Sequence, residues 1–172
     1  MKNLLLVAVL AVFSCIFSEN AQAQAFEKGQ KNFNIGVGFG YGLGANASVD
    51  VGISDLLSLG VVGAFSSRSY GYAFSSNYRV TYIGVGGRVA AHVGKYLKEV
   101  GINEDKLDPY VGAVGGFRAV KYNDTYSSYY GGSSAGLMLG GFVGARYYFK
   151  EKMAVYVEGG FPYSTVGISF KF

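Results

Sequence analysis

Apolar residues alternate with glycine or polar residues along most of the chain after residue 32. From Phe33 to Leu43, for example, every odd position is apolar or aromatic and every even position is glycine or asparagine. A period of two places one kind of side chain on each face of a β-strand, whereas a helix requires a period near 3.6. The alternation therefore predicts an all-β fold.

The same pattern recurs in seven later segments, which are separated by stretches of turn residues. We predict tight turns at 44–46, 54–56 and 150–152. Together with 33–43, the predicted strands number eight, and the other seven occupy 47–53, 57–66, 78–93, 110–122, 135–149, 155–161 and 166–172. The phase changes at one place, between Tyr82 and Ile83. This indicates either a β-bulge near 82–84 or outward-facing side chains at Arg79 and Thr81.

The two faces of the predicted strands differ in charge. The apolar face carries no charged residue in its central positions, whereas the other face holds seven ionisable residues: Asp50, Arg88, His92, Arg118, Arg146, Glu158 and Lys171. Periodicity alone does not show which face is inside. A soluble lipocalin-like barrel buries its apolar face, and a transmembrane barrel turns that face towards lipid.

The first 25 residues have the pattern of a secretory signal peptide. A positive start at Met1-Lys2 precedes an apolar run at 4–13, and small-x-small cleavage sites end at Ala23 and Ala25. We therefore predict a signal peptide at 1–25 and a single barrel domain at 26–172. Export favours the transmembrane alternative.

These observations predict an eight-stranded antiparallel up-and-down transmembrane β-barrel. Lipid offers no partner to an open sheet edge, so the last strand must pair with the first. Eight strands leave an interior just wide enough for side chains. We expect a packed polar interior that is largely non-conducting, with Glu158 and Arg146 as an ion pair. A narrow passive channel or conduit for small molecules is the alternative.

Several segments carry a family resemblance. They are 82–88 (Tyr-Ile-Gly-Val-Gly-Gly-Arg), 107–112, 144–149 (Gly-Ala-Arg-Tyr-Tyr-Phe), Glu158-Gly159 and the ending 167–172. In their order and spacing the chain resembles the small OmpA/OmpX-like outer-membrane barrels of the porin family, and most closely those of Bacteroidetes-type bacteria. The resemblance implies a bacterial outer-membrane location, with outer-membrane lipid and lipopolysaccharide as surroundings. It also implies that the barrel-assembly machinery reads Phe170 and Phe172 as an assembly signal; the alternative is that Phe172 is only the last lipid-facing residue.

Two long connections are predicted to face the exterior if both termini are periplasmic. The segments 66–77 and 122–134 are rich in tyrosine, serine and glycine, a composition typical of binding loops. The candidates for recognition of an extracellular protein or glycan are Tyr70, Tyr72, Tyr126, Tyr129 and Tyr130. Polar loops without a dedicated partner are the alternative. The leading function is a structural or surface-interaction role.

Other functions find little support in the sequence. One histidine and one cysteine cannot form a zinc site, and the basic residues behind the net charge of +4 are scattered, unlike those of a nucleic-acid-binding arm. We predict no catalytic residues and no cofactor, because His92 lies far from the serine-rich loops. The connection at 94–108 contains Lys95–Val100, which is expected to form a short amphipathic helix at the membrane interface or a charged turn.

Overall fold

The computed structural model describes residues 26–72, 75–100, 106–123 and 133–172, and the predicted signal peptide at 1–25 lies outside this part of the chain. The described residues form eight strands, namely β1 (Lys31–Phe39), β2 (Leu43–Gly52), β3 (Leu57–Tyr72), β4 (Ser75–His92), β5 (Leu107–Asn123), β6 (Ser133–Lys150), β7 (Met153–Phe161) and β8 (Ser164–Lys171). A 3-10 helix, η1 (Gly94–Val100), follows β4, so of the two alternatives for Lys95–Val100, a short amphipathic helix or a charged turn, the structure has a short helix.

The strands form a closed antiparallel barrel in which each strand pairs with its neighbours in sequence and β8 pairs with β1. Following the paired residues once around the barrel from Leu137 on β6 leads back to β6 at Tyr147, ten residues further along the strand. A stagger of this kind requires strands that tilt by about 35–45° from the barrel axis. The predicted fold class and the closure are confirmed.

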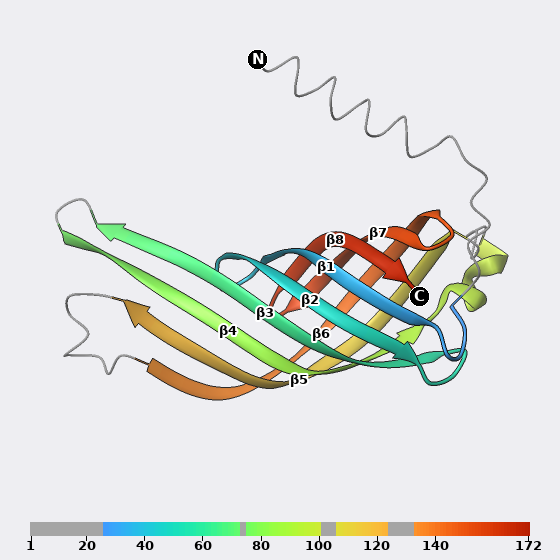
Figure 1. Ribbon diagram of the computed structural model, residues 1–172, viewed down its shortest axis with the longest axis horizontal. Coiled ribbons are helices and arrows are strands. Elements are labelled where there is room, and N and C mark those ends of the chain that lie inside the picture. Colours follow the sequence, from blue (N-terminus) through green and yellow to red (C-terminus); the bar gives the residue numbers. More distant parts are fainter. Residues whose placement is uncertain (1–25, 73–74, 101–105, 124–132) are drawn as a thin grey trace, which may run out of the picture.

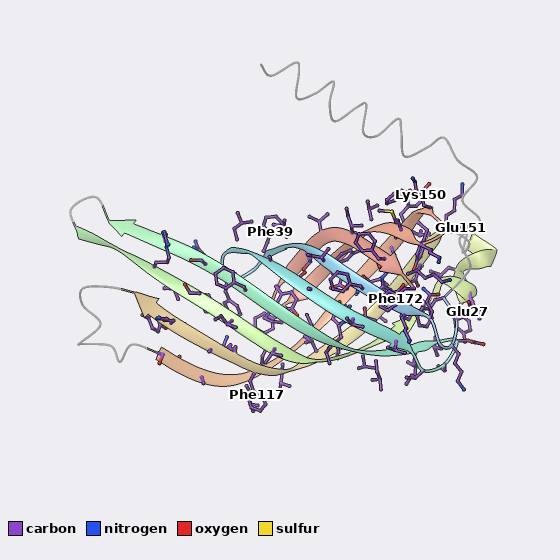
Figure 2. The ribbon with its side chains drawn as sticks, in the orientation of Figure 1. Glu27, Phe39, Phe117, Lys150, Glu151 and Phe172 are labelled. Carbon is purple, nitrogen blue, oxygen red and sulfur yellow. The ribbon has the colours of Figure 1, made fainter. Side chains whose placement is uncertain are left out.

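Apolar side chains cover the outside of the barrel, and charged ones lie inside it. Val61, Val85 and Leu137 are 63%, 62% and 67% exposed, whereas Arg146 and Glu158 are 1% and 4% exposed. This arrangement rejects the lipocalin-like alternative. Figure 2 shows Phe39 and Phe117 near the middle of the long axis, on opposite sides of the barrel, and Glu27, Lys150, Glu151 and Phe172 grouped towards one end. We call this end the terminal end, because β1 begins there and β8 ends there, and we call the part of the barrel from the level of Phe39 and Phe117 away from it the loop end.

The wall of the barrel is uneven in height. Strands β3 to β6 have 16 to 18 residues, and β1, β2, β7 and β8 have 8 to 10. Figure 1 shows the longer four extending far beyond the shorter four. On β3, pairing with β2 stops at Ser67, and on β6, pairing with β7 begins at Gly141. We call the parts of β3 to β6 that lie on the far side of Ser67 and Gly141 from the terminal end the projecting sheet.

Two predicted connections are wrong in position. The segment 66–77 was expected to be a loop, but β3 continues to Tyr72 and β4 starts at Ser75, held together by cross-strand pairs such as Arg68 with Val80. The first turn was expected at 44–46 and lies instead between Phe39 and Leu43. Gly42 has a φ of 147° there, and a Cβ at this position would lie 2.5 Å from the Ser67 carbonyl oxygen, so the turn requires glycine.

The change of phase on β4 is not a bulge. Pairing with both β3 and β5 is continuous from Arg79 to Ala91. Val80 is buried at 3%, and Arg79 is exposed on the opposite face. Of the two alternatives that the sequence left open, the structure therefore agrees with the second, in which Arg79 faces outward.

Candidate functional site

A network of buried ions crosses the middle of the barrel interior. Arg146 donates from Nη2 to Asp50 Oδ2 at 2.9 Å and from Nη1 to Asp108 Oδ2 at 3.1 Å. Arg88 donates from Nη2 to Glu158 Oε1 at 2.5 Å, and its Nε lies 3.1 Å from Asp50 Oδ1. Asp50 thus joins both arginines, and the three carboxylates and two guanidiniums form one connected group. Because unpaired charges in such an interior cost several kcal/mol each, this connection keeps the interior stable.

The predicted ion pair between Glu158 and Arg146 is wrong. Glu158 pairs with Arg88, which reaches it across the lumen from β4, and Arg146 turns to Asp50 and Asp108. On the neighbouring strands β6 and β7, Arg146 stands opposite Tyr156, and Glu158 stands opposite Gly144. The interior of an eight-stranded barrel is narrow enough for a long side chain such as Arg88 to reach a carboxylate on the far side, so pairing is not limited to neighbouring strands.

Two more of the predicted interior residues lie away from this network. Arg118 is at the loop end, where Nη1 donates to the Tyr41 hydroxyl and the guanidinium lies 5.2 Å from the centre of the Tyr41 ring. Lys171 is at the rim of the terminal end, with Nζ 4.0 Å from Glu27 Oε1. Of the seven ionisable residues predicted to line the interior as a polar or ion-pair network, these two therefore do not join the central ion network.

Asp108 is the important interior residue that the sequence analysis missed. It is 4% exposed and connects Arg146 to His92. The sequence analysis assigned Asp108 to the connection at 94–108. In the structure it belongs to β5, where it lies on the inner face in phase with Tyr110 and Gly112. Continuing the alternation from Tyr110 two residues back along the chain would have placed Asp108 on the inner face.

His92 lies on the inner face near the terminal end, as predicted, and has a partner at each ring nitrogen. Nδ1 is 2.8 Å from Asp108 Oδ1, and Nε2 is 3.0 Å from the Ser58 hydroxyl. A serine, a histidine and an aspartate in this order form the hydrogen-bonded arrangement of a nucleophile, a base and an orienting carboxylate. However, Ser58 is only 2% exposed and Phe26 covers the imidazole ring, so in this conformation a substrate carbonyl has no approach to Ser58.

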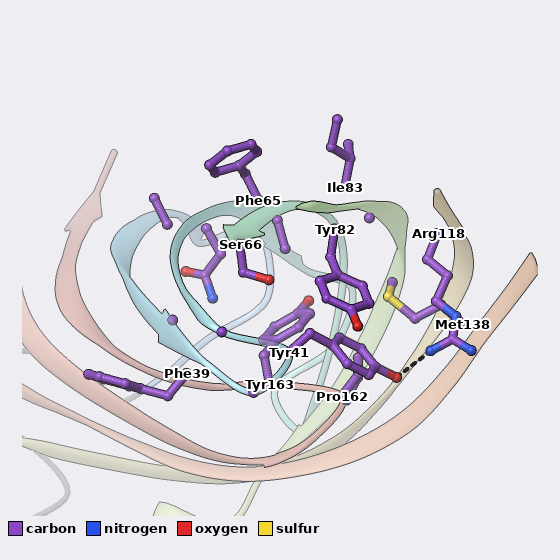
Figure 3. A pocket seen from close by; sticks show the side chains of 17 residues that line it. Phe39, Tyr41, Phe65, Ser66, Tyr82, Ile83, Arg118, Met138, Pro162 and Tyr163 are labelled. Atoms are coloured by element: carbon purple, nitrogen blue, oxygen red, sulfur yellow. Dashed lines mark hydrogen bonds between the residues drawn. The ribbon is translucent and has the colours of Figure 1, made fainter. Parts of the chain in front are cut away.

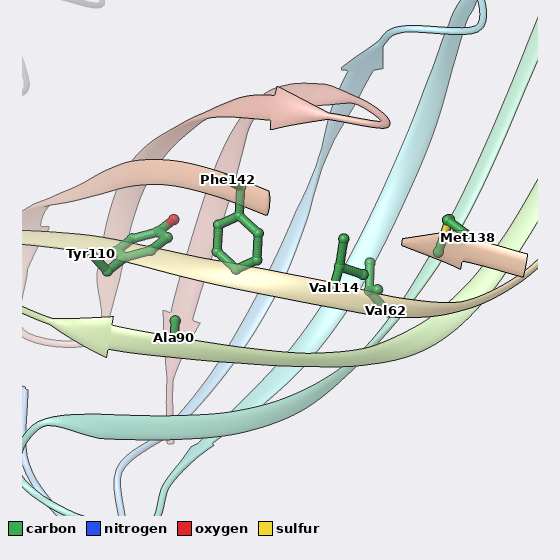
Figure 4. Close-up of a cluster of buried hydrophobic side chains, with 6 residues drawn as sticks. All are labelled: Val62, Ala90, Tyr110, Val114, Met138 and Phe142. Atoms are coloured by element: carbon green, nitrogen blue, oxygen red, sulfur yellow. The ribbon is translucent and has the colours of Figure 1, made fainter. Parts of the chain in front are cut away.

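Apolar side chains fill the interior between the ion network and the loop end. Figure 4 shows this cluster, and its members are Val62, Ala90, Tyr110, Val114, Met138 and Phe142. The interior was expected to be packed with polar side chains, and this apolar cluster was not predicted. Phe142 also packs against the network, because the Arg88 guanidinium lies 4.3 Å from the centre of its ring. The cluster has room because inward-facing glycines such as Gly112 stand beside it.

A small cavity of about 30 Å³ lies at the loop end of the interior. Figure 3 shows Tyr41, Tyr82, Tyr163 and Met138 around it, with Arg118 bonded to Tyr41. Tyr163 lies in the turn between β7 and β8, and its burial raises the pKa of its hydroxyl to about 12. A volume of this size holds about one water molecule, so a larger ligand could enter only if side chains moved.

The projecting sheet carries the exposed polar surface at the loop end. Within its described residues there are four basic side chains, Arg68, Arg79, Arg118 and Lys121, and no acidic one. The recognition candidates Tyr126, Tyr129 and Tyr130 lie outside the described residues, and for Tyr70 and Tyr72 the structure describes only the backbone, in β3. Their role in binding stays a prediction, as does the role of Phe170 and Phe172 in assembly.

No metal-binding group and no membrane-spanning helix is found in the part of the chain that the structure describes. No three or more His, Cys, Asp or Glu side chains there are placed to hold a metal ion. No helix there is long and apolar enough to cross a membrane.

Comparisons with known proteins relate the chain to membrane barrels by fold alone. No family model matches the sequence, and no curated protein matches it. The structure resembles Ail, the attachment invasion locus protein of Yersinia pestis, solved in complex with the heparin analogue sucrose octasulfate, with a TM-score of 0.54 and 12% identity over 84% of this chain and 99% of that one. It also resembles the N-terminal β-barrel domain of Pseudomonas aeruginosa OprF, with a TM-score of 0.54 and 14% identity over 87% of this chain and 100% of that one.

A de novo designed transmembrane β-barrel is similar as well, with a TM-score of 0.50 and 19% identity over 87% of this chain and 100% of the design. These neighbours are all membrane barrels. At such low identity they support the fold class, the eight-stranded transmembrane-type barrel, and carry no function over to this chain.

Proposed function

We propose that this protein is a bacterial outer-membrane barrel that holds a binding surface, the projecting sheet, outside the membrane. The apolar outer face fits lipid, and among the described residues no charged side chain faces outward between the terminal end and the level of Phe39 and Phe117. Both termini then lie on the periplasmic side, and the loop end faces the exterior. The OmpA/OmpX-like and Bacteroidetes-type relationship remains part of this proposal.

The observation that carries the proposal is the shape and charge of the projecting sheet. No described strand pairs with its edge on β3 beyond Ser67 or with its edge on β6 before Gly141, so it extends beyond the closed part of the barrel. Arg79 and Lys121 both face outward on adjacent strands, two residues apart in register. Two cations held this close by a rigid sheet are suited to phosphate or sulfate groups, such as those of lipopolysaccharide or of an acidic glycan.

Binding of a sulfated sugar tests this role. We expect sucrose octasulfate, which Ail binds in its crystal structure, to bind the folded barrel in a salt-dependent way. The double variant Arg79→Ala/Lys121→Ala should weaken binding several-fold. The matched control Lys150→Ala/Lys152→Ala removes the same charge at the terminal end and should leave binding unchanged. Equal loss in both variants would mean that net charge, and not the projecting sheet, attracts the ligand.

We further propose that the interior is largely non-conducting. The ion network and the apolar cluster occupy the interior, and the cavity of about 30 Å³ holds about one water molecule, which supports this proposal. The purified barrel should therefore give no steady conductance in planar bilayers. Regular current steps would favour the alternative, a narrow passive channel.

A further inference from the structure

The turn between β1 and β2 carries an aromatic side chain, Tyr41, that packs against other aromatic rings at the loop end. Its ring is stacked on that of Tyr82 of β4, with 4.6 Å between the ring centres and 17° between the planes. The Phe161 ring of β7 lies edge-on to it, with 6.3 Å between the centres. Tyr41 is only half-buried, whereas Tyr110 and Tyr148 of the interior are each 3% exposed. Tyr41 therefore occupies an aromatic site at the surface of the interior.

The Arg118 guanidinium of β5 binds the same tyrosine. Figure 3 shows its Nη1 donating to the Tyr41 hydroxyl, and its Cζ lies 5.2 Å from the centre of the Tyr41 ring. The guanidiniums of Arg88 and Arg146 each pair with two carboxylates, but no acidic side chain among the described residues pairs with Arg118. A guanidinium has five N–H donors and binds a carboxylate most strongly, through two parallel hydrogen bonds. The phenol oxygen is thus a weaker acceptor than the one that Arg118 is suited to bind.

The cavity of about 30 Å³ at the loop end lies beside this pair and is mostly apolar. Among the described residues that line it, Arg118 is the only charged one. Its apolar lining includes Phe39, Phe65, Ile83 and Met138. An apolar cavity with a single fixed cation suits a ligand that has an apolar body and one anionic group.

The Tyr41 side chain itself indicates which apolar body fits. It is an aromatic ring with an oxygen acceptor at one end, and it places the ring on Tyr82 and the oxygen on Arg118. An aromatic carboxylate of the same width would make both contacts and add a second hydrogen bond and a charge. The cavity holds about one water molecule, so such a ligand fits only where the Tyr41 ring moves away. Tyr41 lies in a turn, where its side chain can rotate outward about the Cα–Cβ bond without moving a strand.

We propose that the loop end contains a binding site for a small aromatic carboxylate. Arg118 binds the carboxylate, Tyr82 stacks on the ring of the ligand, and the Tyr41 side chain is an internal ligand that the carboxylate displaces. Arg118 then has an acceptor in both states, the phenol in the closed site and the carboxylate in the filled one. The site lies inside the barrel wall, apart from the outward-facing Arg79 and Lys121, and does not depend on binding of a sulfated sugar. Because Tyr41 competes with the ligand, removing its ring should strengthen binding, whereas removing the guanidinium should weaken it.

Titration with 4-fluorobenzoate, followed by fluorine NMR of the barrel in phosphatidylcholine nanodiscs, tests the proposal. We expect saturable line broadening that empty nanodiscs do not give. The neutral isostere 4-fluorobenzamide should bind severalfold more weakly. Arg118→Gln should lower the affinity for 4-fluorobenzoate by about tenfold or more, the effect of losing a hydrogen bond between charged groups. The control Lys152→Gln removes the same charge from the exposed β6–β7 turn and should leave binding unchanged.

Variants of Tyr41 separate an internal ligand from a side chain that merely supports the fold. Tyr41→Ala vacates the site and should raise the affinity for 4-fluorobenzoate severalfold, and Tyr41→Phe, which keeps the ring but removes the acceptor from Arg118, should raise it less. The gel shift between boiled and unboiled samples shows that each variant is folded. Loss of binding in folded Tyr41→Ala, equal affinity for the amide, or equal losses in Arg118→Gln and Lys152→Gln would overturn the proposal. Equal competition by octanoate would overturn the assignment of an aromatic ligand.

Discussion

At the scale of single residues, each buried charge in this barrel depends on a partner that comes from another side of the lumen. Glu158 accepts hydrogen bonds from Arg88 and from the Tyr110 hydroxyl, which lie on β4 and β5, while Glu158 itself is on β7. Such contacts join strands that are not neighbours in the wall. They therefore hold the cross-section of the barrel together in a way that the backbone ladder cannot.

Neutralising Glu158 should destabilise the barrel strongly. In Glu158→Gln, Arg88 keeps its charge but loses the carboxylate at 2.5 Å, and we expect the free energy of unfolding in lipid vesicles to fall by about 3–5 kcal/mol. Urea titration followed by the gel shift between boiled and unboiled samples measures this value. The control Glu151→Gln removes the same charge from the exposed β6–β7 turn and should change stability by less than about 0.5 kcal/mol. Similar values for both variants would refute a structural role for the network.

The sequence was sufficient to place charged residues inside but not to pair them. Alternation put Asp50, Arg88, His92, Arg146 and Glu158 on the inner face, and all five are buried. Pairing depends on which side chains meet across the lumen, and that is fixed by the ten-residue stagger of the closed barrel. The stagger is a property of all eight strands together, so no single strand reveals it.

At the scale of strands, inward-facing glycines let the wall curve tightly. Gly86 on β4 and Gly116 on β5 stand opposite each other. A Cβ atom at Gly116 would overlap the Val85 carbonyl oxygen and the Gly86 Cα, which are backbone atoms and cannot move aside without distorting the ladder. Here glycine is needed for the close approach of two strands.

Substitution by alanine should therefore change the stability of the barrel by different amounts at two adjacent glycines of β5. Gly116→Ala places its methyl group against the backbone of β4, and we expect a loss of about 1–3 kcal/mol in the free energy of unfolding. At Gly115 the added methyl would meet only the tip of the Leu139 side chain, at 3.4 Å, so Gly115→Ala should change stability little. Urea unfolding of both variants in vesicles provides the comparison. If Gly115→Ala is the more damaging of the two, the close approach is not what requires glycine.

The phase of the strands was more predictable than their ends. Alternation identifies which residues face inward, because a shift by one residue would turn every side chain to the wrong face. Strand ends depend on pairing with a neighbour. The segments around Ser69 and Asn77 have the composition of loops, yet they lie in β3 and β4, where each strand supplies the other's hydrogen bonds. The amino-acid composition of these segments does not show that another strand pairs with them.

At the scale of the whole molecule, the apolar part of the outer surface forms a belt between the terminal end and the loop end, as expected for a barrel in a bilayer. On β3 the outward side chains run from Leu57 near the terminal end, through Val61, to Phe65 near the loop end, and all three are exposed. An apolar belt of about 25 Å bordered by aromatic residues is typical of outer-membrane barrels. Val61 lies midway along this run and would therefore lie near the centre of the bilayer.

A charge on the outer face should then cost more at Val61 than at Leu57. The penalty for arginine on a lipid-facing strand is about 2–4 kcal/mol at the bilayer midplane and about 0–1 kcal/mol near the interfaces. We expect Val61→Arg to lower the free energy of unfolding in phospholipid vesicles by the larger amount and Leu57→Arg by the smaller. Both positions lie on the outer face of β3, and Leu57 is the less exposed of the two, at 36% against 63% for Val61, so lost contacts alone would make Leu57→Arg the more damaging substitution. In an aqueous environment both substitutions would be nearly neutral. Only burial of the outer face in lipid produces a penalty that grows with depth, so the difference between the two variants tests the membrane placement of the entire barrel.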